Sequence, residues 1–199
     1  MHYDPRLRGD GVPQIAITAL VLPRPIGWIS TLGTDGVVNL APYSFFNAIA
    51  GRPPFVMFAS SGRKDSQRNA ETSGEFVANL ATFDLREEVN ATSATFAPEI
   101  DEAALAGLEM APSLNVRPPR VLRSPVALEC LTTNIIPLVC RDGTTSYNTV
   151  IVGEVVGIYI DDAVLTDGRI DVRKLRPISR LGYDEYAVTE TIFNMKRPN

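Results

Sequence analysis

The amino-acid sequence predicts a mainly β protein, an antiparallel β-barrel with short helical insertions, built as a single domain over residues 1–199. Two patterns favour this fold class: short apolar and β-branched runs outnumber helical patterns, and the helical patterns are brief. The composition, 45% hydrophobic and 21% charged residues, is ordinary for a globular domain. A chain of 199 residues is also long enough to bury a full core.

The first half of the chain is expected to alternate strands with turns. Residues 13–21 can form a short opening helix that Pro23 and Pro25 stop. The pair Asp35-Gly36 tolerates positive φ and therefore predicts a hairpin turn. The expected extended segments of this half are Ile26–Leu32, Val37–Leu40, Ser44–Ile49, Phe55–Ser60 and Glu75–Ala81.

A loop rich in hydroxyl and basic side chains follows the expected strand Phe55–Ser60. It reads Ser60-Ser61-Gly62-Arg63-Lys64-Asp65-Ser66, and Asp65 is expected to cap a helix over Ser66–Thr72 that ends at Gly74. Hydroxyl groups, free backbone N–H groups, positive charge and a helix N-terminus together suit a phosphate. The same residues could instead form a solvated turn before a capped helix, and the local sequence leaves both interpretations open.

The second half of the chain is expected to contain two long strands. Asp84 followed by Glu87 is a capping-box pattern that predicts a helix through about Ala94. The proline- and arginine-rich segment Pro112–Pro125 is expected to be irregular. The long strands are expected at Val126–Ile136 and Thr149–Ile160.

A run of aromatic residues lies in the extended segment Pro42-Tyr43-Ser44-Phe45-Phe46-Asn47. Such a segment can offer main-chain N–H and C=O groups to the edge of a flat heterocycle while the rings enclose it. Alternatively, Phe45 and Phe46 belong to the barrel core. The run by itself does not decide between these two roles.

Charge and composition exclude several partners and locations. A net charge of −4 and a pI near 5.1 argue against nucleic acid or an anionic membrane as the main partner. The polar N-terminus does not resemble a signal peptide, and no apolar run reaches the ~18 residues of a membrane helix. Cys130 and Cys140 lie in apolar sequence and are expected to be reduced core thiols. We therefore expect a cytoplasmic protein.

The residue types available for catalysis are few. The single histidine is His2, near a terminus, so a Ser-His-Asp or Cys-His site is not expected. No His, Cys and carboxylate cluster has metal-ligand spacing, and neither a P-loop nor a Rossmann motif is present. If the protein is an enzyme, its chemistry must come from a bound organic cofactor.

A series of motifs resembles the flavin reductase-like family, whose fold is the FMN-binding split β-barrel. The motifs are PRPIGWIST from Pro23, DGVVNLAPYSFFNA from Asp35, PPFVMF, RKDSQRN and GEFVANL, then Asn90–Ala94, Pro118–Glu129 and Arg180–Tyr183 with Tyr186-Ala187. They span roughly residues 20 to 187. Each motif is weak alone, and their number, order and spacing carry the resemblance.

The resemblance implies bound FMN, a homodimer with the flavin near the subunit interface, and hydride or electron transfer through the flavin. It places Ser60, Ser61, Arg63, Lys64, Asp65 and Ser66 at the phosphate, Ser30 and Thr31 on a strand lining the flavin, and Ser44, Phe45, Phe46 and Asn47 along the isoalloxazine. It places Asn79, Asn90, Thr92 and Ser93 near the flavin or its ribityl chain, and Arg180, Gly182 and Tyr183 beside the site. Capping and core roles explain Asn79, Asn90, Thr92 and Ser93 nearly as well, and a purely structural role explains Arg180, Gly182 and Tyr183 equally well.

One feature departs from part of the family. Shorter NAD(P)H:flavin reductases often have a histidine near the nicotinamide in their C-terminal part, where this chain has Arg180-Leu181-Gly182-Tyr183. The chain is therefore nearer the longer, flavoredoxin-like members.

Three functions follow from the resemblance, and the sequence does not separate them. The favoured one is an NAD(P)H:FMN reductase that takes hydride from NADH or NADPH and serves a partner monooxygenase or another acceptor. The others are an FMN-carrying electron-transfer protein and a non-catalytic flavin-binding dimer. No catalytic residue is assigned.

Overall fold

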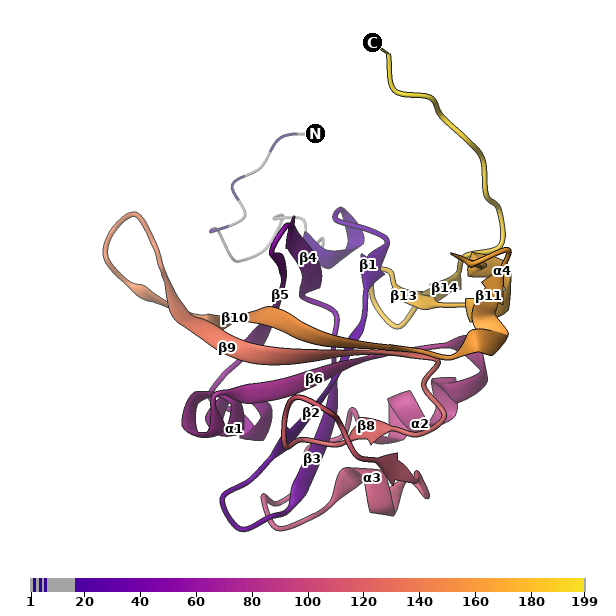
Figure 1. Cartoon of the computed structure of the whole chain (residues 1–199). Coiled ribbons are helices and arrows are strands. Elements are labelled where there is room, and N and C mark those ends of the chain that lie inside the picture. Colours follow the sequence, from indigo (N-terminus) through magenta and orange to yellow (C-terminus); the bar gives the residue numbers. More distant parts are fainter. Residues whose placement is uncertain (1, 3, 5, 7–16, 199) are drawn as a thin grey trace.

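A seven-stranded antiparallel sheet forms the centre of the protein (Figure 1). The structure is a computed structural model that describes residues 2, 4, 6 and 17–198. The strand order is β3-β2-β6-β9-β10-β5-β4. These strands are β2 (Gly27–Leu32), β3 (Val38–Tyr43), β4 (Phe46–Gly51), β5 (Pro54–Ser61), β6 (Glu75–Leu80), β9 (Val126–Val139) and β10 (Thr145–Ile160). The predicted mainly β class is confirmed.

The two edge strands of this sheet, β3 and β4, are consecutive in the chain. Only Ser44 and Phe45 separate them, so the sheet must curl until its edges meet. The N–H of Ala59 on β5 donates a hydrogen bond to the carbonyl oxygen of Phe45 over 2.8 Å, which holds this link against the barrel. We call the line where the edges meet, Tyr43–Phe46, the seam.

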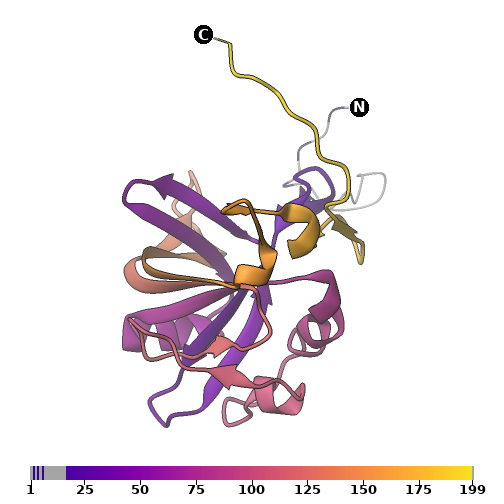
Figure 2. The same cartoon turned by 45° about the vertical axis from the view of Figure 1, so that its right-hand side comes forward.

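Short helices and small strand pairs cover the barrel. The helices are η1 (Ile17–Ala19), α1 (Asp65–Ser73), η2 (Phe83–Leu85), α2 (Arg86–Ala91), α3 (Glu102–Leu105), η3 (Asp162–Val164) and α4 (Val172–Leu175). The small strands are β1 (Arg24–Pro25), β7 (Met110–Ala111), β8 (Arg120–Val121), β11 (Leu165–Thr166), β12 (Arg169–Ile170), β13 (Ile178–Arg180) and β14 (Tyr186–Val188). Figure 2 shows the last two strands beside β1, with which β13 pairs, before the C-terminal segment leaves the body.

Alternating side chains of the strands supply two cores. On β2, Ile29 faces the barrel interior, where Phe58 and Phe76 meet edge to face with 5.3 Å between ring centroids. Its neighbour Trp28 faces the opposite side and packs with Leu40 under the helices. All five side chains are fully buried, and each contributes about 1.5–3 kcal/mol by leaving water.

Several element boundaries differ from the sequence predictions. Strand β3 continues through Pro42 to Tyr43, which an edge strand allows because proline lacks only a hydrogen-bond donor. The capping-box prediction at Asp84 is wrong: a 3₁₀ turn comes first, its N-cap is Thr82, and the α-helix ends at Ala91 instead of Ala94. Of the expected opening helix, residues 13–16 lie outside the described residues and Ile17–Ala19 forms a 3₁₀ turn.

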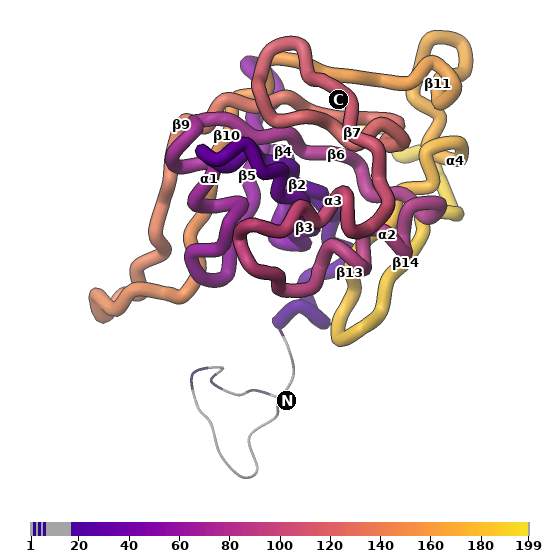
Figure 3. The backbone as a smooth tube through the Cα atoms, turned by 90° about the horizontal axis from the view of Figure 1, so that it is seen from below, coloured from indigo at the N-terminus to yellow at the C-terminus, as the bar shows by residue number. Residues whose placement is uncertain are grey.

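The β9–β10 hairpin extends beyond the barrel (Figure 3). Cys140 lies at its turn and is exposed, so the prediction of two core thiols is wrong for Cys140 and confirmed for Cys130, which is buried. Pro112–Pro125 is irregular apart from β8. Within residues 17–198, the helices are all too short or too polar to cross a membrane.

Candidate functional site

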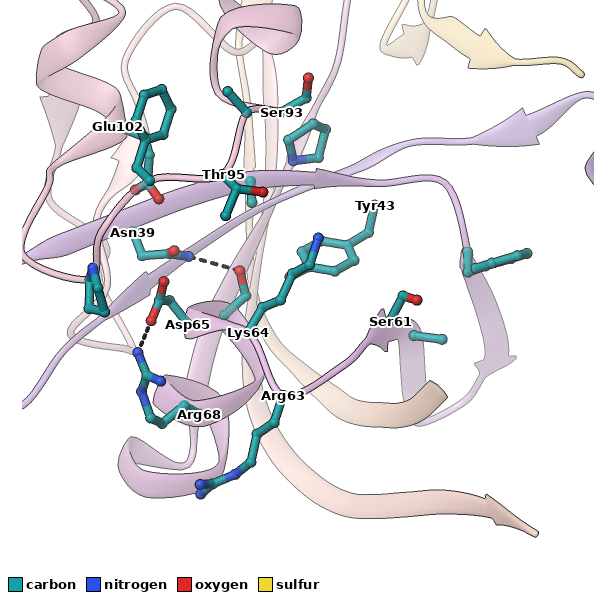
Figure 4. A pocket seen from close by; sticks show the side chains of 18 of the residues that line it. Asn39, Tyr43, Ser61, Arg63, Lys64, Asp65, Arg68, Ser93, Thr95 and Glu102 are labelled. Atoms are coloured by element: carbon teal, nitrogen blue, oxygen red, sulfur yellow. Dashed lines mark hydrogen bonds and ion pairs between the residues drawn. The ribbon is translucent and has the colours of Figure 1, made fainter. Parts of the chain in front are cut away.

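A cavity of about 370 Å³ lies at the seam, between β3, the loop after β5 and the segment that follows α2 (Figure 4). Eight of the sequence-predicted residues line it: Ser44, Phe45, Ser61, Arg63, Lys64, Asp65, Ser66 and Ser93. Residues from three distant parts of the sequence therefore meet here. We call it the seam cavity.

Gly62 sets the shape of the loop between β5 and α1. Its φ is +78°, and a Cβ there would lie 2.6 Å from the hydroxyl of Tyr147, so only glycine fits. Its N–H donates to the carbonyl oxygen of Tyr147 over 2.9 Å, which ties the loop to β10. The buried hydroxyl of Ser60 donates a hydrogen bond to the carbonyl oxygen of Gly62 over 2.7 Å.

The N-terminus of α1 presents unpaired donors at this loop. Among the described residues, none accepts a hydrogen bond from the backbone N–H groups of Asp65, Ser66 or Gln67. The predicted capping role of Asp65 is wrong, because the N-cap is Lys64 and no side chain caps the helix. Asp65 instead begins the helix and forms an ion pair with Arg68. An anion at this helix end would satisfy donors that the protein leaves open.

The two predicted phosphate-binding cations point in different directions (Figure 4). The guanidinium group of Arg63 points away from the cavity and binds Glu71, with 2.8 Å between Arg63 Nη2 and Glu71 Oε2. Lys64 extends towards Tyr43 and the cavity, and its ammonium group has no ion-pair partner among the residues that the structure describes. Lys64 is therefore the cation available to an anionic ligand.

Asn39 organises the floor of the seam cavity. Its amide donates to Ser66 Oγ over 2.8 Å and to Thr31 Oγ1 over 3.2 Å, and Asn69 donates to the same Thr31 oxygen over 3.1 Å. Burial raises the pKa of the Tyr43 hydroxyl, while hydrogen bonds with Ser66 and Ser60 act in the opposite direction. The hydroxyl of Ser66 is thus held in place at the start of α1.

A buried carboxyl group closes one wall of the cavity. Glu102, on α3, accepts a hydrogen bond from the N–H of Leu40 over 3.0 Å. Burial raises its pKa, and the hydrogen bond from Leu40 offsets part of that rise. Asn39, Tyr43 and Glu102 were not among the predicted site residues. Asn39 had a local signal as a polar residue within an apolar strand, and Tyr43 had one as part of the aromatic run, whereas Glu102 had none.

A second cavity of about 450 Å³ adjoins the first, and both are lined by Pro42, Ser44 and Ser93. We call it the arginine cavity, because Arg24 and Arg180 line it. Three further residues carried over by the family resemblance are found here or next to it. Asn90 and Tyr183 line the cavity, and Gly182 packs against Ala19, where a Cβ would lie 2.5 Å from the alanine Cβ.

Five predicted residues are buried with partners inside the protein, outside the lining of both cavities. Ser60 binds Gly62 as described, and Thr92 accepts a hydrogen bond from the indole N–H of Trp28 over 2.9 Å. Ser30 donates to the carbonyl oxygen of Pro119, and Asn79 accepts from the N–H of Val121. Ser30 and Asn79 thereby hold β2 and β6 against the irregular segment Pro112–Pro125. Thr31 likewise supports Asn39 from below.

The two phenylalanines of the predicted aromatic wall, Phe45 in the link and Phe46 at the start of β4, have different surroundings. Phe45 lines the seam cavity and is 42% exposed. Phe46 is half-buried, packs on the barrel core and covers Gly27, where a Cβ would lie 2.4 Å from its ring. Asn47 is exposed and outside the cavity lining. A flat ligand in the cavity would meet Phe45 and Tyr43.

The residues present fit FMN. The open N–H groups of α1, the hydroxyls of Ser61 and Ser66, and Lys64 suit a phosphate, while Tyr43 and Phe45 suit a ring system. In the described part of the chain no three His, Cys, Asp or Glu side chains gather as a metal site would require.

A split barrel with an open helix N-terminus beside aromatic side chains is the arrangement of the flavin-binding split-barrel proteins. The chain belongs to the flavin reductase-like family: the family model described as "Flavin reductase like domain" matches residues 19–178. Members of this family generally bind FMN.

Similar proteins include one relative and two solved structures. An uncharacterised protein of Halalkalibacterium halodurans is 39% identical over 184 residues, covering 89% of this chain and 87% of its own. Nitrilotriacetate monooxygenase component B from Bacillus cereus superposes with a TM-score of 0.89 at 30% identity, covering 98% of each chain. The 2-nitrobenzoate 2-nitroreductase of Pseudomonas fluorescens superposes with a TM-score of 0.81 at 30% identity, covering 92% of this chain and 88% of its own.

Proposed function

We propose that this protein is an FMN-dependent oxidoreductase that takes hydride from NADH or NADPH. One observation carries the proposal: the open N–H groups at the start of α1 and the unpaired Lys64 converge on a cavity that also has an aromatic wall. Because the chain belongs to the flavin reductase-like family, we infer that the ligand is FMN, which combines a phosphate with a flat ring system.

In this proposal the residues of the chain bind and orient, and none has to exchange a proton. Lys64 and the α1 N-terminus hold the phosphate, and Ser66, fixed by Asn39, adds a hydroxyl. Tyr43 and Phe45 exclude water from one side of the ring. Bound FMN supplies the hydride acceptor. Holding two reactants in contact is the contribution of the protein to such a reaction.

The proposed use of the electrons is delivery to a partner monooxygenase. The likeness to nitrilotriacetate monooxygenase component B, at 30% identity over nearly the whole of both chains, supports this use. The likeness to a nitroreductase at the same identity makes direct reduction of a nitroaromatic compound the second candidate.

We also propose a homodimer. The support is the exposed apolar surface on the β9–β10 hairpin, where Val139 is 65% and Tyr147 77% exposed. Large apolar side chains gathered on a projecting hairpin favour burial against another chain. Phe45, at the seam, belongs to the same class of exposed apolar residues.

The test is an anaerobic reduction followed by turnover. The purified protein, loaded with FMN, is mixed with NADH or NADPH, and bleaching of the flavin absorbance is recorded. Free FMN and 2-nitrobenzoate are then added as separate acceptors. Rapid bleaching with turnover of free FMN supports the reductase, and turnover of 2-nitrobenzoate alone supports the second candidate. Bleaching by dithionite but by neither nicotinamide would contradict both and indicate an electron carrier. Failure to bind FMN would contradict all three.

A further inference from the structure

Two arginines lie side by side at the arginine cavity. Arg24 on β1 and Arg180 on β13 are register partners in an antiparallel pair. Directly opposed residues in such a pair are close neighbours, so both guanidinium groups reach the same cavity. Two adjacent positive charges repel each other, and a negative group bound between them offsets this repulsion.

Arg24 is buried, and its hydrogen bonding is incomplete. Its guanidinium donates to the carbonyl oxygens of Val21 and Leu181, each over 2.8 Å, and also to that of Thr18. These bonds fix the orientation of the group. Only 6% of the residue is exposed, and its Nε is buried without a hydrogen-bond acceptor. A buried, unsatisfied N–H on a charged group is costly and points to a missing acceptor.

The positive charge at this cavity is also compensated only weakly. Among the described residues no carboxylate forms a salt bridge with Arg24. Arg180 donates hydrogen bonds to the hydroxyl of Tyr186 and to the carbonyl oxygen of Tyr183, and its one carboxylate contact within the described residues is at 3.4 Å, with the fully exposed Asp184. Exposed pairs of this kind are weak. Burial, and then the proximity of Arg180, lower the pKa of Arg24, which is the effect expected where a counter-charge is absent.

The position of the arginine cavity relates it to the proposed flavin site. The two cavities share Pro42, Ser44 and Ser93, so a single elongated molecule can reach from one into the other. The exposed rings of Tyr183 and Tyr186 also line the arginine cavity and offer surface to an aromatic group.

We propose that Arg24 and Arg180 bind the diphosphate group of the nicotinamide dinucleotide, with the nicotinamide end in the seam cavity. Two guanidinium groups offer two linked phosphates their positive charge and the N–H donors that the protein leaves open, Nε of Arg24 among them. This inference rests on the proposed function for the identity of the ligand, while the anion site itself stands on the geometry of the two arginines.

The first test measures binding of inorganic pyrophosphate by isothermal titration calorimetry, with and without FMN. The variants are Arg180→Gln and the matched control Arg169→Gln, an exposed arginine on β12 outside both cavities. We expect Arg180→Gln to weaken pyrophosphate binding roughly 10- to 100-fold and Arg169→Gln to leave it unchanged. If Arg180→Gln unfolds, Arg180→Lys keeps the charge, loses the paired donors and should still weaken binding several-fold.

The second test identifies the source of the anion. NADH is compared with a reduced N-benzyl nicotinamide, which carries no phosphate. Arg180→Gln should lower kcat/KM for NADH and leave the reaction with the benzyl compound unchanged.

Three results would contradict the proposal directly, and a fourth would overturn it by reassigning Arg180. The three are no pyrophosphate binding by the parent protein, an unchanged kcat/KM for NADH in Arg180→Gln, and an equal loss with both donors. A loss of FMN affinity in Arg180→Gln would assign Arg180 to the flavin instead and also overturn it. Because pyrophosphate binding is measured without FMN too, a protein that binds no flavin would contradict the proposed function without deciding the anion site.

Discussion

The guanidinium of Arg63 is bound to the carboxylate of Glu71 on the outer side of α1, with 2.9 Å between Arg63 Nε and Glu71 Oε2. This pair separates two neighbouring cations that look equivalent in the sequence. Lys64 is left as the one that reaches towards the seam cavity (Figure 4).

The first prediction concerns these two cations. Lys64→Ala should weaken FMN binding roughly 10- to 100-fold, because a charge-assisted hydrogen bond to the phosphate is lost. Arg63→Ala should weaken it less than threefold, because that side chain already pairs with Glu71. Dissociation constants for FMN and riboflavin are measured for both variants. Riboflavin lacks the phosphate and should bind equally to all three proteins. An equal loss for both flavins in Lys64→Ala would indicate a disturbed loop.

The second prediction concerns Asp65 and Arg68, which form an ion pair beside the cavity. Arg68→Ala leaves the carboxylate of Asp65 uncompensated near the proposed phosphate, so FMN should bind roughly five- to tenfold more weakly. Adding Asp65→Asn should restore most of that affinity. A double variant that binds FMN no better than Arg68→Ala would show that the charge of Asp65 does not act on the ligand.

The third prediction concerns Thr92, which the family resemblance places near the flavin and the structure places against Trp28. Thr92→Val keeps the shape but removes the acceptor of a buried indole N–H, which should cost about 1–3 kcal/mol of unfolding free energy. FMN affinity of the folded variant should not change. Since Trp28 is the single tryptophan, its fluorescence reports directly on the loss. A large drop in FMN affinity at unchanged stability would return Thr92 to the flavin site.

The fourth prediction is a pH dependence that arises at Glu129. Burial tends to raise the pKa of this carboxyl, but hydrogen bonds from Leu114 and Asn115 outweigh it, so the pKa is lowered. A lowered folded-state pKa means that the stabilisation is complete above the unfolded pKa and is lost as the pH falls through the folded value. Glu129→Gln should therefore be less stable than the parent by about 1–3 kcal/mol at neutral pH. The difference should shrink below pH ~4. Thermal unfolding across pH measures it, and a difference that stays constant would contradict the assignment.

The fifth prediction concerns assembly. Light scattering of the FMN-loaded protein should give twice the chain mass of 21.7 kDa. Val139→Asp, on the exposed hairpin, should shift the protein towards monomer because it places a charge in the proposed interface. A monomer that carries FMN would contradict the homodimer.

The phosphate-type loop could be predicted because its components are neighbours in the sequence. Hydroxyls, Gly62 and the basic pair lie between a strand and a helix, and local rules describe each of them. The different roles of Arg63 and Lys64 could not be predicted, since they depend on Glu71, which lies eight residues after Arg63 in the chain. The same is true of Asp65, whose carboxylate turns to Arg68 instead of capping the helix.

The remaining parts of the site depend on contacts between distant segments. Thr92 and Trp28 are 64 residues apart in the sequence, and no local pattern predicts the hydrogen bond between them. Glu102 reaches the cavity only because α3 packs on β3. The small sheet of β1, β13 and β14 was also missed, because strands of two or three residues have no measurable periodicity.

An antiparallel sheet opens most easily at its edges, where a strand has a hydrogen-bonded neighbour on one side only. Both edges of this barrel meet at the seam, and the proposed cofactor would lie there. The ligand would then enter through the same local opening of the sheet edges that begins the unfolding of the barrel. A ligand that binds only the closed barrel stabilises it in proportion to the logarithm of its concentration. The lifetime of this protein in the cell would therefore follow the supply of flavin.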